Sequence, residues 1–166
     1  MSPPVSYTHG NLHASAVGWL GTFVAHTPEV AIADNATVFL DDESEVQPDA
    51  FLFWKRPDAS GLHVTVADYL EGTPELVMEI AASSASYDLH DKLEAYRRAG
   101  LPEYVVWQIY EARIVWFRLR DGVYERVEPD ANGVIESASF PGLRLHVGKM
   151  LAGDLAGMLA ELARAG

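Results

Sequence analysis

Hydrophobic residues recur every three or four positions in three stretches of the chain, and this spacing is typical of amphipathic helices. The first stretch runs from about His9 to Ala25. The second follows the N-cap candidates of Ser83–Ser86 and ends at Ala99, where Gly100 is a stop signal. The third covers Met150 to Ala163. The sequence therefore predicts one helix near each end of the chain and one in its middle.

Short apolar runs between these helices predict strands. The clearest runs from Glu75 to Ala81, and its near-continuous apolar character is typical of a central strand covered on both faces. Asp121-Gly122 lies between two alternating runs and predicts a hairpin. The other expected strands are Val38–Leu40, Val46–Trp54, Glu103–Ile109, Arg113–Arg120, Val123–Val127 and Leu143–Val147. The order of elements around one mixed sheet predicts an α/β or α+β fold.

Composition indicates one globular domain that spans residues 1–166. Hydrophobic residues make up 49% of the chain and charged residues 22%. The chain has no cysteine, which excludes thiolate metal sites, a cysteine nucleophile and a disulfide scaffold, and suits a reducing cytoplasm. The N-terminus lacks the pattern of a signal peptide, and no apolar run reaches the roughly 18 residues that a bilayer span needs. We therefore expect a cytoplasmic protein without a membrane partner.

The net charge of −12 argues against a protein that holds nucleic acid by bulk electrostatics, because phosphates are repelled at long range. It does not exclude an enzyme that acts on phosphates through bound divalent cations, since such ions invert the local charge.

One glutamate interrupts the most apolar predicted strand. Glu79 stands between Met78 and Ile80, and because side chains alternate along a strand it shares a face with Val77 and Ala81. A buried carboxylate is costly unless it is paired, protonated or bound to a metal ion. The pattern leaves two interpretations open: a basic partner from elsewhere in the chain, or a functional site.

A second carboxylate lies at the start of another apolar run. Asp49 follows Gln47-Pro48, where an aspartate is also common as a simple turn residue. If the two strands are neighbours, Asp49 and Glu79 lie a few ångströms apart and cannot both ionise without a cation between them. Carboxylate oxygens are hard ligands, so the pair predicts a Mg²⁺ or Mn²⁺ site.

Lys92 is the third candidate. It stands four residues after Asp88, and an ion pair at this spacing contributes about 0.2–0.5 kcal/mol to a helix. Lys92 also lies one turn from Leu89 and Tyr96, at the edge of the expected buried stripe, where a long side chain can reach toward the sheet. The lysine is thus either half of a helix ion pair or a member of the carboxylate site.

An ordered set of short segments carries a resemblance to a known family. The set comprises Gln47-Pro48-Asp49, Thr73-Pro74-Glu75-Leu76-Val77-Met78-Glu79-Ile80, Asp88, Lys92, Tyr96, Gly100, Glu103-Tyr104, Asp121-Gly122-Val123-Tyr124 and Phe140-Pro141-Gly142-Leu143. It resembles the Uma-two family of bacterial endonucleases, within the PD-(D/E)XK nuclease superfamily. The likeness covers most of the chain from His9 onward, and its specificity lies in order and spacing.

The resemblance implies a restriction endonuclease-like mixed sheet flanked by helices and a Mg²⁺-dependent endonuclease that hydrolyses DNA. It implies that Asp49 and Glu79 bind the metal, with the backbone carbonyl of Ile80 as a further ligand. In the usual superfamily motif a lysine stands two residues after the acid, and here that position is Ala81. In proteins similar to this one the following helix supplies the lysine, which matches Lys92.

The front of the chain departs from the family pattern. Related chains carry a further helix and hairpin before the segment that looks like Ser6–Gly10, and that hairpin supplies an acidic residue. We expect this chain to lack both, so a degenerate nuclease fold that serves as a binding or assembly module is the alternative function. An enzyme that uses the carboxylate pair without metal would leave Lys92 unexplained. His9 matches a histidine of the relatives, or is a surface residue.

Partners follow less directly from the sequence. Arg97-Arg98 and other basic residues are available for DNA, although a solvated helix face is the favoured interpretation of that pair. Four tryptophans are many for a small domain, and they predict self-association as a homo-oligomer such as a dimer, although core packing explains them equally well. They are Trp19, Trp54, Trp107 and Trp116.

Overall fold

The structure of the chain is a computed structural model that describes residues 4–82 and 86–164. The long first helix begins after Ser6, whose side chain accepts a hydrogen bond from the backbone N–H of His9. Such a cap satisfies one of the free N–H groups at a helix start. The helices are α1 (Tyr7–Ala25), α2 (Ser86–Ala99), α3 (Val147–Leu151) and α4 (Leu155–Arg164).

A six-stranded sheet forms the centre of the molecule. Its strands are β1 (Val30–Ala33), β4 (Ala50–Trp54), β7 (Leu76–Ala81), β8 (Glu103–Gln108), β9 (Arg113–Arg120) and β10 (Val123–Val127). They lie in the order β1-β4-β7-β8-β9-β10. Strands β7 and β8 are parallel and joined through α2, and the other neighbours are antiparallel. The candidate strand β7 is therefore central, as its apolar sequence predicts.

Two smaller sheets accompany the central sheet in the described part of the chain. A four-stranded sheet has the order β3-β2-β6-β5, and a two-stranded sheet pairs β11 with β12. Their strands are β2 (Val38–Phe39), β3 (Glu45–Val46), β5 (His63–Val64), β6 (Leu70–Glu71), β11 (Val134–Glu136) and β12 (Arg144–His146). The predicted single mixed sheet is thus a central mixed sheet with two satellites.

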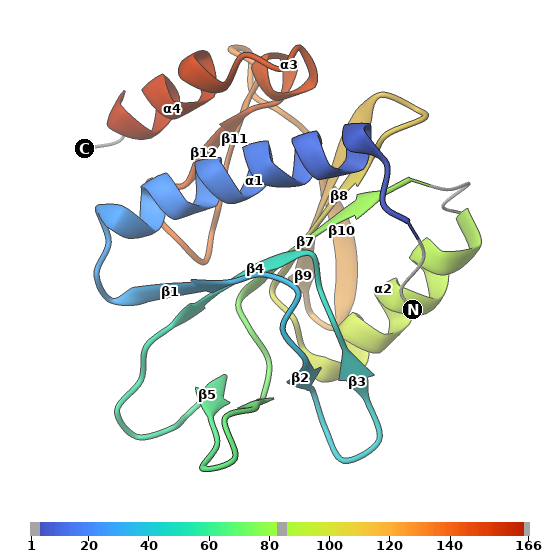
Figure 1. The fold of residues 1–166 in the computed structure, drawn as a ribbon, viewed down its shortest axis with the longest axis vertical. Coiled ribbons are helices and arrows are strands. Elements are labelled where there is room, and N and C mark those ends of the chain that lie inside the picture. The colour runs from blue at the N-terminus through green and yellow to red at the C-terminus, as the bar shows by residue number, and fades with distance from the viewer. Residues whose placement is uncertain (1–3, 83–85, 165–166) are drawn as a thin grey trace.

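Helices cover the two faces of the central sheet. Figure 1 shows α1 and α4 on one side of the sheet, and α2 on the other side. One apolar cluster joins α1 to the face that carries Met78 and Ile80, and the second joins α2 to the face that carries Val77. Because side chains alternate along β7, Glu79 points to the α2 side with Val77.

Several predicted elements are confirmed by the structure. The first helix, β7, the end of α2 and the β9–β10 hairpin lie where the pattern puts them. Gly100 after α2 has a φ of 75°, and Asp121 and Gly122 both have positive φ, as a two-residue hairpin turn requires. The N-cap candidates at 83–85 lie outside the described residues.

Two predicted elements are wrong in extent. The run Val46–Trp54 is divided between β3 and β4, because Pro48 cannot donate to a sheet ladder. The expected C-terminal helix is divided into α3 and α4, because the chain turns at Gly153, whose φ is 73°. Four short strands lie outside the predicted ones, since none has a long apolar or alternating run: β1, β5, β6 and β11.

Three of the four tryptophans belong to the core. Trp19 and Trp116 are fully buried, and Trp107 is 3% exposed. Trp54 is partly exposed and packs against Phe140 with ring centroids 5.3 Å apart. Core packing explains the three buried side chains, and self-association stays a prediction. Among the described residues, no helix combines the length and the apolar character that crossing a bilayer requires.

Candidate functional site

The two candidate carboxylates meet where β4 begins beside β7. The antiparallel register pairs Ala50 with Met78, and one further step places Asp49 opposite Glu79. Directly opposed residues of an antiparallel pair point to the same face, with Cβ atoms about 4.5–5.5 Å apart. The neighbouring charge of Asp49 contributes to the raised pKa of Glu79, as this proximity requires. The predicted convergence of the two acids is therefore present.

Pro48 stops the β4–β7 ladder at this point. The same register places Pro48 opposite Ile80, but proline has no N–H, and its carbonyl accepts a hydrogen bond from the N–H of Asn35 at 3.0 Å. Ile80 therefore finds side-chain partners instead of strand partners. Its N–H donates to Asp49 Oδ2 at 2.7 Å, and its carbonyl accepts from His9 Nε2 at 3.2 Å. The end of one strand thus leaves polar backbone of its neighbour available to side chains.

Glu79 has partners from α2 on both carboxylate oxygens. Lys92 Nζ lies 3.0 Å from Oε2, and the Tyr96 hydroxyl donates to Oε1 at 3.2 Å. Lys92 and Tyr96 are four residues apart and share a face of α2. This helix covers the face of the sheet that carries Val77 and Glu79. Glu79 is 8% exposed, whereas 49% of the Lys92 side chain is exposed. Lys92 is therefore an exposed side chain whose ammonium group contacts a buried carboxylate.

Burial dominates the electrostatics of this cluster. Removal from water raises the pKa of Glu79, Lys92 opposes this shift, and the nearby Asp49 adds to it. Burial and the adjacent Glu79 also raise the pKa of the Tyr96 phenol. Tyr96 therefore stays protonated at neutral pH and acts as a hydrogen-bond donor. The net result is a carboxylate whose charge is unfavourable in the fold and is only partly offset by one lysine.

The raised pKa of Glu79 predicts how stability depends on pH in the metal-free protein. A carboxyl whose pKa is higher in the folded state than in the unfolded state binds more protons when folded, so its contribution falls as pH rises between the two values. The variant Glu79→Gln removes this contribution. We expect the free energy of unfolding of the variant minus that of the parent to be larger at pH 8 than at pH 5, because the parent loses the Glu79 contribution as pH rises. Urea unfolding in EDTA at both pH values measures the difference, and an equal difference at both would contradict the raised pKa.

The oxygen atoms at this place suit a hard divalent cation. They are the carboxylates of Asp49 and Glu79 and the carbonyl of Ile80, and Mg²⁺ commonly takes one or two carboxylates and keeps several waters. Asp49 accepts a hydrogen bond from the Ile80 N–H with one oxygen, and its side chain accepts no other hydrogen bond within the described residues. No group of three or more His, Cys, Asp or Glu side chains is placed to hold a metal in the described part of the chain. A site here would rest on two carboxylates, one carbonyl and water.

Three further side chains lie at this place without a role predicted from the sequence. Tyr96 is predicted as a buried stripe residue and belongs to the segments that resemble the family, and its spacing from Lys92 puts both on one helix face. His9 and His13 are one turn apart on α1 and contact the backbone of Ile80 and Asp49. Their i, i+4 spacing is visible in the sequence, but their partners are backbone carbonyls, which every residue carries. The Asp88 side chain lies outside the described residues, so its expected pair with Lys92 is not observed.

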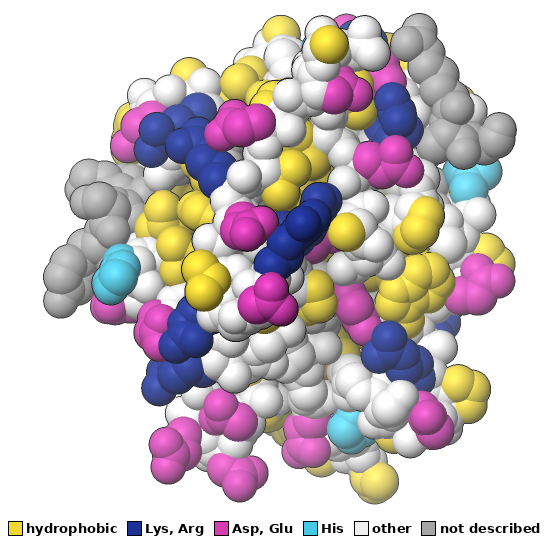
Figure 2. Space-filling model, turned by 180° about the vertical axis from the view of Figure 1, so that it is seen from behind, with side chains coloured by type: hydrophobic (Ala, Val, Ile, Leu, Met, Phe, Trp, Pro, Cys, Tyr) yellow, Lys and Arg dark blue, Asp and Glu magenta, His cyan; other side chains and the backbone are white. Residues whose placement is uncertain are grey.

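Basic side chains do not gather into one surface on the α2 side. Figure 2 views the molecule from behind and shows Lys and Arg interspersed with Asp and Glu. Arg97 is paired with Glu94 on α2 at 2.6 Å, as the solvated-face interpretation expects. Any contact with a nucleic acid backbone would therefore involve scattered cations.

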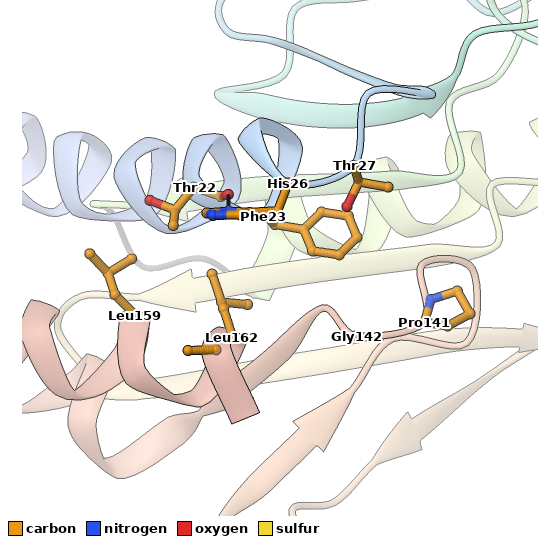
Figure 3. A pocket seen from close by; sticks show the side chains of 9 residues that line it. Thr22, Phe23, His26, Thr27, Pro141, Gly142, Leu159 and Leu162 are labelled. Carbon is orange, nitrogen blue, oxygen red and sulfur yellow. Dashed lines mark hydrogen bonds between the residues drawn. The ribbon is translucent and has the colours of Figure 1, made fainter. Parts of the chain in front are cut away.

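A separate hollow lies at the far end of α1. Figure 3 shows it between the last turn of α1, the Pro141–Gly142 turn and α4, and its volume is about 370 Å³. Its lining includes His26 and threonines but no acid or lysine. About 1.5 Å of rise per residue puts about 20 Å between His9 and Phe23 on α1. The hollow is therefore distinct from the carboxylate cluster.

Comparison with solved structures defines the class of fold. The chain is similar to a protein whose crystal structure is described as "a putative nuclease belonging to DUF820" from Anabaena variabilis, with a TM-score of 0.64 and 10% sequence identity. The likeness covers 98% of this chain and 86% of the other. The predicted restriction endonuclease-like fold is thereby confirmed. At this identity the likeness concerns the fold alone.

The family follows from the sequence itself. Residues 1–148 match the model of the Uma2 (Uma-two) family, described as "Putative restriction endonuclease". The chain belongs to this family, as the ordered set of segments predicts. No curated protein matches the chain.

Proposed function

We propose that the protein is a divalent metal-dependent endonuclease that hydrolyses phosphodiester bonds in DNA, with Asp49, Glu79 and Lys92 at its active site. One observation carries the proposal: the register places Asp49 opposite a buried Glu79, and Lys92 Nζ lies 3.0 Å from the Glu79 carboxylate. Membership of an endonuclease family supports it. A buried Glu79 beside the partly buried Asp49 and an exposed lysine is poorly explained by stability, because burying a charge is costly.

Each residue has a distinct part in the proposed reaction. Asp49 and Glu79 would hold Mg²⁺ or Mn²⁺, with the Ile80 carbonyl as a third ligand. The ion would lower the pKa of a bound water and offset charge on the phosphate oxygens. Tyr96 fixes the orientation of Glu79 through Oε1. Lys92, half exposed, supplies a positive charge beside the phosphate. Water would attack the phosphorus and release one proton to the solvent, the bridging P–O bond would break, and the leaving oxygen would take a proton from solvent water.

Thermal unfolding with added metal tests the first step. A ligand that binds only the folded state stabilises it, and a concentration ten times the dissociation constant contributes about 1.4 kcal/mol. For a domain of this size we expect Mg²⁺ or Mn²⁺ to raise Tm by about 3–5 °C. The rise is expected to disappear in Glu79→Gln. The matched control is Glu125→Gln, which changes a well-exposed glutamate on β10 and should retain the rise.

Cleavage of supercoiled plasmid with Mn²⁺, and its suppression by EDTA, tests the second step. Metal stabilisation with cleavage supports the proposal. A parent protein that shows neither metal stabilisation nor cleavage would instead favour the alternative, a nuclease fold used as a binding or assembly module.

A further inference from the structure

Two histidines join α1 to the candidate site. His9 Nε2 lies 3.2 Å from the Ile80 carbonyl, and His13 Nε2 lies 2.9 Å from the Asp49 carbonyl. The two rings are one helical turn apart and stack nearly parallel, with centroids 6.4 Å apart and planes 8° apart. They reach the two strands at the place where β4 begins and the β4–β7 ladder has ended.

The chemistry of the partners fixes the direction of both hydrogen bonds. A backbone carbonyl only accepts, so each imidazole must carry a hydrogen on Nε2 and donate it. In both rings Nε2 therefore donates to a backbone carbonyl and is not available to bind a ligand. His13 Nε2 also lies 3.9 Å from Asp34 Oδ2, a longer contact than its bond to Asp49. The shorter contact identifies the carbonyl of Asp49 as the main partner of His13.

The histidine contacts close a ring through the backbone that bears the candidate ligands. The Ile80 N–H holds the Asp49 side chain, His13 holds the Asp49 carbonyl, and His9 holds the Ile80 carbonyl. Pro48 has no N–H with which to hold Ile80 in place of the helix. Pairing with β4 therefore does not hold this edge of β7, although pairing with β8 continues on the other edge, and α1 contacts the unpaired edge through two side chains.

We propose that His9 and His13 are positioning residues, which form a clamp from α1 that holds the Ile80 carbonyl and the Asp49 backbone in the orientation needed to bind the divalent ion. The metal consequence rests on the proposed function, whereas the clamp itself does not. A carbonyl oxygen has two lone pairs, so donation from His9 to one leaves the other for a ligand. Partners of this kind orient metal ligands, and their loss typically costs 10–100-fold in metal affinity.

Metal affinity is the first test. Calorimetric titration with Mn²⁺ compares the parent, His9→Leu and His9→Gln. Leucine removes the N–H donor, while glutamine keeps an N–H at a similar distance from the backbone. We expect His9→Leu to weaken Mn²⁺ binding by about 10-fold and His9→Gln to stay within about 3-fold of the parent. Equal loss in both variants would overturn the clamp, because it would mean that the imidazole itself is needed. His26→Leu is the matched control, since this histidine caps the C-terminal end of α1, and among the described contacts its side chain hydrogen-bonds only to the Thr22 carbonyl.

Amide exchange in metal-free protein is the second test, and it is independent of metal binding. The Ile80 N–H donates to Asp49, so loosening either carbonyl should speed its exchange. We expect at least 10-fold faster exchange of this amide in His9→Leu and His13→Leu, and no change in His26→Leu. If the parent binds no metal but exchange responds, the proposed function fails and the clamp stands. If the parent binds metal while exchange and affinity are unchanged in His9→Leu, the clamp fails and the function stands.

Discussion

Replacing Lys92 with methionine is expected to slow metal-dependent DNA cleavage by about 10²–10³-fold, which is the usual cost of removing one charge-stabilising group from an active site. Methionine keeps the apolar stem and removes the ammonium group. Half of the Lys92 side chain is exposed, so its ion pair with Glu79 is screened and contributes little to folding. We therefore expect the free energy of unfolding to change by less than about 1 kcal/mol. Single-turnover cleavage and urea unfolding measure the two effects.

Arg98→Met is the matched control, because it removes one positive charge from an exposed position of the same helix. It should lower cleavage by less than about 3-fold through weaker attraction of DNA. If both variants lost cleavage equally, Lys92 would act only through general electrostatics. If Lys92→Met instead unfolded easily, the lysine would be a structural partner of the buried Glu79, and its proposed role in the reaction would be wrong.

Replacing Glu103 with alanine is expected to destabilise the protein by about 3–5 kcal/mol, because removing one member of a buried ionic network leaves the others without partners. Glu103 is fully buried. Its carboxylate accepts hydrogen bonds from Trp116 Nε1 at 2.8 Å, Arg118 Nη2 at 3.2 Å, the Ser139 N–H at 2.9 Å and the Ser137 hydroxyl. These bonds join β8 to β9 and to the segment that links β11 with β12.

Thermal unfolding measures this effect, and for a domain of this size the loss corresponds to a fall in Tm of about 10 °C. The control Glu125→Ala removes a carboxylate that is largely exposed and lies 3.6 Å from Arg120. We expect it to change stability by less than about 1 kcal/mol. If Glu103→Ala also changed stability by less than about 1 kcal/mol, the Glu103 network would contribute little.

The sequence predicts the centre of the fold and of the candidate site because their signals are local. Glu79 stands out as a charge in an apolar strand, and the alternation of β7 assigns its face. The end of α2 and the β9–β10 hairpin are marked by glycines with positive φ. Lys92 is within reach because α2 directly follows β7 along the chain.

The rest depends on tertiary context. Strands of two residues, such as β5 and β6, have no periodicity of their own and form because their partners are nearby. Pro48 marks the division of Val46–Trp54 in the sequence, because a residue without an N–H cannot continue a sheet ladder. The contacts of His9 and His13 could not be inferred, because a backbone carbonyl has no sequence signature.

Pro48 separates two kinds of main-chain pairing along β7. Before it, β7 pairs with the backbone of β4. Opposite and beyond it, the main-chain groups of Ile80 bond to the side chains of His9 on α1 and of Asp49. A mutation that restored an N–H at position 48 would let β4 donate a hydrogen bond to the Ile80 carbonyl in place of His9, without changing either acid. A descendant could therefore keep every charged group of the site and still become inert, so an inventory of acids and lysines is not a sufficient test for activity among homologous chains.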